Sequence, residues 1–195
     1  TDAERKRLAL LHLFQGFVHV DALRCMGDPD EEWCVPGLRG LSREDEIRLL
    51  DRAAEVGLLT ALGGGYYRIH PAMPWFFKKL FDQYYAGSET LATRAYVEAM
   101  GELGNYYRRQ YDAGNREFIG NLTAEEANLI QARRLARANA WWLRVISTMQ
   151  GLQPLYDQTG RRTEWARLVQ EVVPDFVDPA TDGPLAGREE EWSVV

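Results

Sequence analysis

Residues 58–70 of the chain read Leu58-Leu59-Thr60-Ala61-Leu62-Gly63-Gly64-Gly65-Tyr66-Tyr67-Arg68-Ile69-His70. Two short β-prone runs lie on either side of three consecutive glycines, a pattern typical of a β-hairpin with a glycine turn. A phosphate-binding loop would instead need Lys-Ser or Lys-Thr after the glycines, followed by the start of a helix. The segment therefore predicts a hairpin and argues against a phosphate loop at this position.

Helical patterns precede the hairpin. Residues 4–14 place apolar side chains on one helical face, and Asp21 is suited to cap a short second helix that ends at a turn rich in Asp and Gly. Ser42 and Asp45 have the spacing of a capping box, which predicts a third helix over residues 43–56.

Three helices followed by a β-hairpin is the order of elements in the winged-helix layout. Beyond the hairpin, Pro71 and Pro74 bracket the first turn of another strongly apolar helix, where proline is tolerated. We expect this helix to pack against the hairpin. The sequence therefore predicts a winged-helix module over residues 1–86.

From Gly87 onward the apolar spacing is helical. Four segments with this spacing are expected to begin near Ser88, Thr123, Trp141 and Thr163. Paired helices of about 15 residues with small residues at their contacts are typical of an α-solenoid. We therefore expect a mainly α protein, in which tetratricopeptide-like helical hairpins over residues 87–195 follow the winged-helix module.

Composition places the chain among globular proteins. Hydrophobic residues make up 46% of its 195 residues, and the formal net charge is -6. That charge has the wrong sign for a dedicated binder of nucleic acid or of anionic membranes. Because no apolar run is long enough to span a bilayer and no signal-peptide pattern is present, we expect a cytoplasmic protein without membrane contact.

The two ends of the sequence suggest a piece of a longer protein. The chain begins without Met and ends in a glutamate-rich helix start with no stop signal behind it. We expect the helical array to be truncated at its C-terminus, with an apolar edge around Trp165, Leu168, Val169 and Trp192. Self-association through that end is the expected consequence.

Catalytic and metal-binding patterns are missing from the sequence. Cys25 and Cys34 are the only cysteines, and His12, His19 and His70 have no metal-ligand spacing and no nucleophile signature around them. We therefore expect no catalytic residue, no metal, free thiols and no enzyme activity in this chain. His70 alone has two competing interpretations, because a histidine between a strand and a proline-led helix is more often a structural group than a binding one.

Five arginines are candidates for binding a partner: Arg108, Arg109, Arg133, Arg134 and Arg137. They lie on two expected helices that could be neighbours, which would make a modest basic surface. A solvated helix face is the common interpretation of such charges. The sharper hypothesis is a site for an acidic peptide or for another domain of the parent protein.

The third expected helix raises the alternative of DNA binding, because winged helices often lay this helix in the major groove. Its basic residues are Arg43, Arg48 and Arg52, but five acidic residues lie among them: Glu44, Asp45, Glu46, Asp51 and Glu55. This acidity argues against phosphate contact. A winged-helix transcription regulator with a helical sensor or dimerisation domain is therefore the alternative hypothesis.

One segment resembles a known family. Tyr66-Tyr67-Arg68-Ile69-His70-Pro71-Ala72-Met73-Pro74-Trp75-Phe76-Phe77 resembles the hydrophobic-His-Pro/Asp-Leu signature in the winged-helix domain of STAND-class signalling ATPases, the relatives of plant and animal NB-ARC switches. In that family the histidine contacts the β-phosphate of bound ADP and holds the off state. The resemblance implies this role for His70 in a full-length parent, although Pro71 stands where many relatives carry Asp.

The helical part resembles bacterial members of the same family. Residues 123–132 resemble the E-x-x-N-L-x-x-A helix that opens their tetratricopeptide-like region, and residues 155–168 resemble the Tyr/Gly/Ala/Leu joint between two such helices. The family's phosphate loop and metal-binding Asp are absent from this chain. The resemblance therefore implies a non-catalytic regulatory role without a cofactor of its own, with ADP or ATP bound by an upstream domain of the parent and the helical repeats binding a protein partner.

Overall fold

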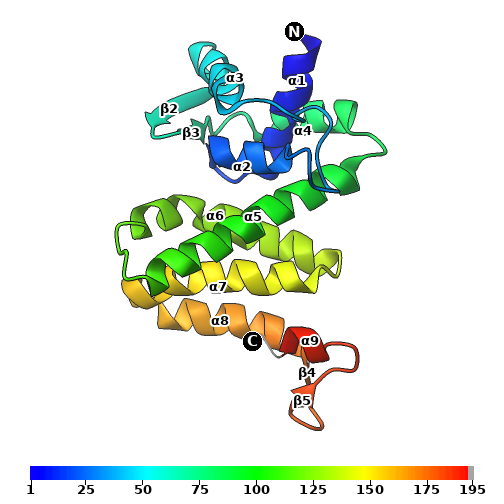
Figure 1. The fold of residues 1–195 in the computed structure, drawn as a ribbon, viewed down its shortest axis with the longest axis vertical. Coiled ribbons are helices and arrows are strands. Elements are labelled where there is room, and N and C mark those ends of the chain that lie inside the picture. The colour runs from blue at the N-terminus through cyan, green and yellow to red at the C-terminus, as the bar shows by residue number, and fades with distance from the viewer. Residues whose placement is uncertain (193–195) are drawn as a thin grey trace.

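The structure is a computed structural model that describes residues 1–192, most of which are helical (Figure 1). A mainly α fold is thereby confirmed. The N-terminal elements are α1 (Asp2–Ala9), the 3-10 helix η1 (Leu10–Leu13), β1 (Phe17–His19), α2 (Val20–Met26), α3 (Arg43–Glu55), β2 (Leu59–Gly63), β3 (Tyr66–Ile69) and α4 (Pro74–Tyr84). The remaining elements are α5 (Glu89–Asp112), α6 (Ile119–Ala138), α7 (Trp142–Thr159), α8 (Arg162–Val172), η2 (Val173–Asp175), β4 (Val177–Asp178), β5 (Gly183–Pro184) and α9 (Glu189–Trp192).

The predicted hairpin is confirmed and gains a third strand. The sheet is antiparallel in the order β1-β3-β2, with Phe17 opposite Arg68 and Leu59 opposite Ile69. The turn residue Gly65 has a φ of +88°, in the region that favours glycine. Strand β1 was not predicted, because three residues are too few to show an alternating pattern.

Side-chain caps set the starts of α1, α2 and α3. The predicted capping box of α3 is confirmed: Ser42 Oγ accepts from the backbone N–H of Asp45 at 3.1 Å, and Asp45 accepts from the backbone N–H of Ser42 at 3.2 Å. The cap predicted for α2 is wrong by two residues. His19, not Asp21, caps this helix, because β1 delivers the histidine ring to the free N–H of Asp21 at 3.3 Å.

The first helix is shorter than predicted. Residues 4–14 were expected to form one helix, but α1 ends at Ala9 and the chain tightens into η1 before Phe14 becomes extended. A 3-10 turn of this kind lets a helix end within a few residues. The chain thereby reaches β1 directly after the turn.

The predicted start of α6 at Thr123 is also wrong. The helix begins one turn earlier, and the hydroxyl of Thr123 donates to the carbonyl of Ile119 at 2.8 Å inside the helix. The additional turn brings Phe118 against Tyr106, with ring centroids 5.4 Å apart and nearly perpendicular. Tertiary packing therefore overrides the capping-box pattern at Thr123.

The end of α7 is as predicted, whereas the cap of α8 is not. Gly160 ends α7 in the left-handed conformation, with a φ of +69°. Thr163 lies within α8 rather than at its cap, which is Arg161. The guanidinium of Arg161 pairs with Glu126 of α6 at 2.8 Å and with Glu164 of α8 at 2.5 Å. These two ion pairs hold the turn between α7 and α8 against α6.

Two glycines allow α5 and α7 to touch through their backbones. A Cβ on Gly151 would lie 2.4 Å from the Cα of Gly104, and a Cβ on Gly104 would lie 2.6 Å from the carbonyl oxygen of Ser147. Real side-chain atoms do not approach so closely, so no other residue fits at either position without displacing a helix. The backbones of α5 and α7 therefore meet at these two glycines.

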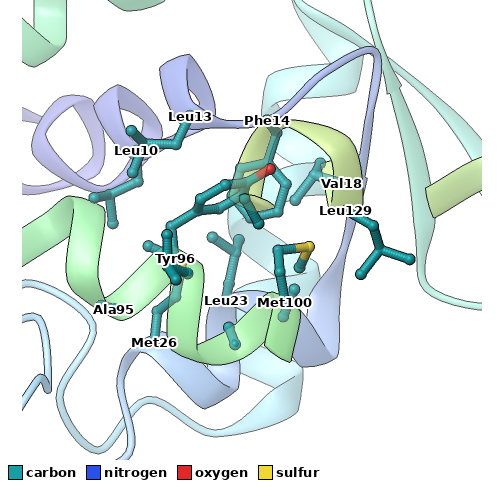
Figure 2. Close-up of a cluster of buried hydrophobic side chains, with 14 of the residues drawn as sticks. Leu10, Leu13, Phe14, Val18, Leu23, Met26, Ala95, Tyr96, Met100 and Leu129 are labelled. Atoms are coloured by element: carbon teal, nitrogen blue, oxygen red, sulfur yellow. The ribbon is translucent and has the colours of Figure 1, made fainter. Parts of the chain in front are cut away.

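The N-terminal elements and the helices share one apolar core. Phe14 packs edge to face on Tyr96 of α5, with ring centroids 5.0 Å apart, and Val18, Leu23 and Met100 belong to the same buried cluster (Figure 2). All five side chains are buried. Helix α5 therefore contributes to the core of the N-terminal part as well as to that of the helical part.

The end of the helical array differs in part from the expected apolar edge. Trp165 and Val169 are half-buried and line a groove of about 620 Å³ with Phe176, whereas Leu168 is buried in the apolar core. The side chain of Trp192 lies outside the described part of the structure. Within residues 1–192, no helix combines the length and apolar character needed to cross a membrane.

Candidate functional site

His70 lies at the surface where β3 ends. Its backbone N–H donates to the carbonyl of Leu58 at 3.1 Å, and its Nδ1 accepts from the backbone N–H of Ala72 at 3.2 Å. Because Nδ1 is an acceptor, the neutral ring carries its proton on Nε2. The exposed ring therefore presents an N–H donor to the outside, which is the state that an anionic ligand would need.

A hollow of about 500 Å³ adjoins His70, formed by residues 11–17, the end of β3 and the start of α4. Arg68 and Lys78 supply positive charge to it, and Trp75 leaves 66% of its surface exposed at its rim. No carboxylate is among the described residues that line this hollow. The site thus combines two cations, an imidazole donor and an aromatic ring.

Each cation in the hollow is held by a neighbour. The guanidinium of Arg68 lies 5.3 Å from the ring centroid of Phe17, and Lys78 pairs with Asp82 one helical turn away at 2.7 Å. Burial lowers the pKa of His12, the other histidine of the hollow, which keeps its ring neutral near pH 7. Because Lys78 is paired with a carboxylate and His12 is neutral, Arg68 and His70 are the polar groups best placed to meet a ligand.

The five candidate arginines do not form one continuous surface. Arg133 is buried, donates to the carbonyl of Leu168 at 3.1 Å and pairs with Glu171 at 2.5 Å. Arg137 pairs with Asp175 at 2.6 Å. Both side chains therefore fasten α6 to the α8 and η2 segment.

The other three candidates differ among themselves. Arg108 pairs with Asp112 at 3.0 Å and donates to Gln153 of α7 at 2.6 Å. Arg109 and Arg134 are exposed. These two are the candidates whose positions suit a partner, and the basic partner surface stays a prediction.

The arginines of α3 are matched by acids of the same chain. Arg43 pairs with Asp21 at 3.1 Å, Arg48 pairs with Asp45, and Arg52 pairs with Glu4 of α1. Each guanidinium that would meet a DNA phosphate is thus already beside a carboxylate. The face of α3 presents little uncompensated positive charge.

A buried polar junction joins α6 to the N-terminal part. Asn128 Oδ1 accepts from the backbone N–H of Gln15 at 2.6 Å, while its Nδ2 donates to the carbonyl of Phe17 at 3.0 Å and to Glu125 Oε2 at 2.7 Å. The hydroxyl of Tyr96 donates to the backbone carbonyl of Asn128 at 3.0 Å. Residues more than a hundred positions apart in the sequence meet here through hydrogen bonds of the buried Asn128 side chain.

Glu125 is the ionisable group of this junction. Burial raises its pKa to about 7, against the hydrogen bond from Asn128, which lowers it. Its Oε1 has no hydrogen-bond partner among the described residues. Burial also raises the pKa of Tyr66, to about 12, and that of Tyr107, and the hydroxyls of these two tyrosines lie 3.1 Å apart.

The sequence pattern marked this junction without revealing its role. Glu125, Asn128, Leu129 and Ala132 are the letters of the E-x-x-N-L-x-x-A pattern, and all four are buried. Two polar residues on the apolar face of an expected helix were the available signal, since buried polar groups require partners. Glu125 accepts from Asn128, and Asn128 bonds backbone groups of Gln15 and Phe17, which no spacing in the sequence connects to α6.

The remaining candidates for chemistry are clusters of metal-ligating side chains and the two cysteines. No group of three or more His, Cys, Asp or Glu side chains in this range is placed to hold a metal ion. Cys25 and Cys34 are free thiols, and burial raises the pKa of Cys25 to about 11, so it is protonated near pH 7.

Comparisons with known proteins add no relative. No protein-family model, no curated protein and no solved structure matches the chain. The functional argument therefore depends on the residues and contacts of the chain itself.

Proposed function

We propose that the chain is a non-catalytic regulatory and protein-interaction part of a nucleotide-switched signalling protein of the STAND class. In this proposal residues 1–86 are a winged-helix module that restrains the switch, and the helices from α5 onward are tetratricopeptide-like hairpins that bind a protein partner. The nucleotide, ADP or ATP, belongs to another domain of the parent protein. His70 is the residue that meets its phosphate.

The arrangement of elements supports both halves of the proposal. The three-stranded order β1-β3-β2, in which a strand between the first two helices pairs with the hairpin, supports the winged-helix half of the proposal. Helical repeats are expected to stack through small residues, and the Gly104 to Gly151 contact between α5 and α7 is of this kind.

The exposed ring of His70 is the observation that carries the proposal. His70 is exposed and its Nδ1 accepts from the N–H of Ala72, which leaves Nε2 as the ring atom available to a ligand. A hydrogen bond from Nε2 to a phosphate oxygen is charge-assisted and contributes roughly 1.5 to 3 kcal/mol. That energy is enough to favour an ADP-bound off state by about tenfold or more.

The test compares ADP release from the nucleotide-switched protein that contains this chain with release from its His70→Ala variant. We expect release to be about tenfold faster in the variant, with higher basal signalling and an unchanged melting temperature of the chain. His19→Asn is the matched control, because asparagine also caps helices and His19 lies outside the hollow. Unchanged ADP release together with a large fall in melting temperature would show that His70 is structural.

The DNA-binding alternative is disfavoured by the paired arginines of α3. Duplex binding of micromolar or tighter affinity that weakens steeply with salt would nevertheless move the proposal to a transcription regulator. The chain should show no such binding near physiological salt.

A further inference from the structure

Part of the lining of the hollow beside His70 is a short segment that contains a glycine with positive φ. Residues 15–17 line the hollow together with Arg68 and His70. Gly16, in the middle of this segment, has a φ of +80°, in the region that side chains disfavour. The segment needs outside support to hold this shape, because it belongs to no helix and only its last residue enters β1.

Support comes from two sides. On the side of the hollow, the backbone N–H of Ile69 donates to the carbonyl of Gly16 at 2.8 Å, and Ile69 directly precedes His70. From α6, the carboxamide of Asn128 bonds both neighbours of Gly16, accepting from the N–H of Gln15 and donating to the carbonyl of Phe17. One side chain of α6 thus hydrogen-bonds to both residues that flank Gly16, and Gly16 in turn accepts from Ile69 at the end of β3.

Asn128 is itself held in one orientation. Its side chain is fully buried, its Nδ2 also donates to Glu125, and its backbone carbonyl accepts from the hydroxyl of Tyr96 on α5. Buried hydrogen bonds of this kind are strongly directional, and a buried polar group left without its partner is costly. A displacement of α6 therefore cannot leave residues 15–17 in place without breaking the hydrogen bonds of Asn128 to Gln15 and Phe17.

We propose that Asn128 is the positioning residue through which the helical region sets the shape of the hollow beside His70. A partner that shifts α6 would change the position of His70 without touching it. What the hollow binds rests on the proposed function, but the coupling itself is a property of this chain. It extends the proposal by giving a route from the partner-binding region to the switch.

The experiment follows amide hydrogen exchange and the ring signals of His70 by NMR in the whole chain. In Asn128→Ala we expect the amides of Gln15 and Ile69 to exchange at least tenfold faster relative to amides in the middle of α7, and the ring signals of His70 to shift. The matched control is Leu129→Ala, which truncates the neighbouring buried side chain of the same helix. It should accelerate exchange throughout and leave the His70 signals unchanged.

Two results would overturn the proposal. One is an Asn128→Ala spectrum in which exchange rises equally everywhere, as in the control. The other is a spectrum in which the ring signals of His70 do not shift although the amide of Gln15 exchanges faster.

If Asn128→Ala does not fold, Asn128→Asp decides the question. This variant keeps an oxygen acceptor for Gln15 but loses the donor to Phe17, so the amide of Gln15 should stay protected while the His70 signals shift. Unchanged His70 signals in a folded Asn128→Asp protein would contradict the coupling. Neither measurement uses a nucleotide, so a failed ADP experiment and a failed coupling experiment are distinguishable.

Discussion

The N-terminal elements α1 to α4 and the helices α5 to α8 are held together by different kinds of polar interaction. In the N-terminal part the ion pairs lie at the surface, as in Arg52 with Glu4 or Lys78 with Asp82. In the helical part they reach inside: Glu98 is fully buried between Arg94 and Arg144.

The difference follows from how each part builds its core. A sheet and short helices can fill the N-terminal core with apolar side chains, helped by local caps such as Ser42. The long helices instead approach through glycines and alanines, which supply little apolar surface, so buried charges with partners occupy part of their interface. The helical part therefore depends more on individual long-range contacts.

The largest effect is expected where α5 and α7 touch. Gly151→Ala should lower the free energy of unfolding by about 3 kcal/mol or more, because the new Cβ would lie 2.4 Å from the backbone of Gly104 and a helix must move. Urea denaturation measures the change. Gly120→Ala is the control: this glycine lies in α6 with open space around it, so alanine there should stabilise the protein by about 0.5 to 1 kcal/mol.

Equal effects of the two glycine substitutions would contradict the close helix crossing. Destabilisation by Gly120→Ala would show that α6 has a neighbour on its outer face. Either result would weaken the contrast between the two parts.

The next effect concerns the ionisation of Glu125. Its pKa is about 7 in the folded chain, above the ordinary value of 4.5, because burial disfavours the charged form. The folded state then binds more protons than the unfolded state between pH 4.5 and 7, so stability falls as pH rises through this window and levels off above it. The fall amounts to about 3 kcal/mol.

Glu125→Gln should remove this part of the pH dependence. The amide oxygen still accepts from Asn128, so the variant should be less sensitive to pH between 4.5 and 7 when unfolding is followed at several pH values. Glu46 will leave a residual slope up to about pH 8, because burial raises its pKa to about 8. Glu126→Gln is the control, because hydrogen bonds from Arg161 and Tyr156 hold the pKa of Glu126 below its usual value despite burial. This variant should therefore keep the fall in stability between pH 4.5 and 7.

The smallest effects separate surface pairs from buried ones. Arg52→Ala breaks an exposed pair and should change the free energy of unfolding by less than about 0.5 kcal/mol. Arg133→Ala removes a buried stem and the bonds to Leu168 and Glu171, and should lower it by about 2 kcal/mol. Thermal unfolding of both variants in parallel gives the comparison. Equal losses would remove the distinction between the two parts.

Local chemistry made much of the fold predictable from the sequence. Three glycines between β-prone runs define the hairpin, and Ser42 with Asp45 defines the start of α3, because each signal lies within a few residues. Local sequence signals failed to predict the start of a helix where contacts between distant residues determine it. Thr123 has a capping pattern but lies inside α6, since packing of Phe118 on Tyr106 extends the helix.

The candidate site was predictable only in part for the same reason. His70 was recognisable from the residues beside it, and its exposure agrees with the binding interpretation, which still awaits a test. The role of Asn128 was hidden, because its partners Gln15 and Phe17 lie more than a hundred residues away. Arg133 was expected at a solvated surface, whereas the packing of α8 buries it.

The most direct test asks whether the two parts, despite their different stabilisation, form one unit through the shared core and the Asn128 junction. The measurement is residue-resolved amide hydrogen exchange of the unmodified chain over a series of low urea concentrations. We predict that the most protected amides of β3 and of α6 converge on the same opening free energy and the same urea dependence. Opening of β3 at a much lower free energy, while α6 and α7 keep full protection, would show two independent units and contradict the account.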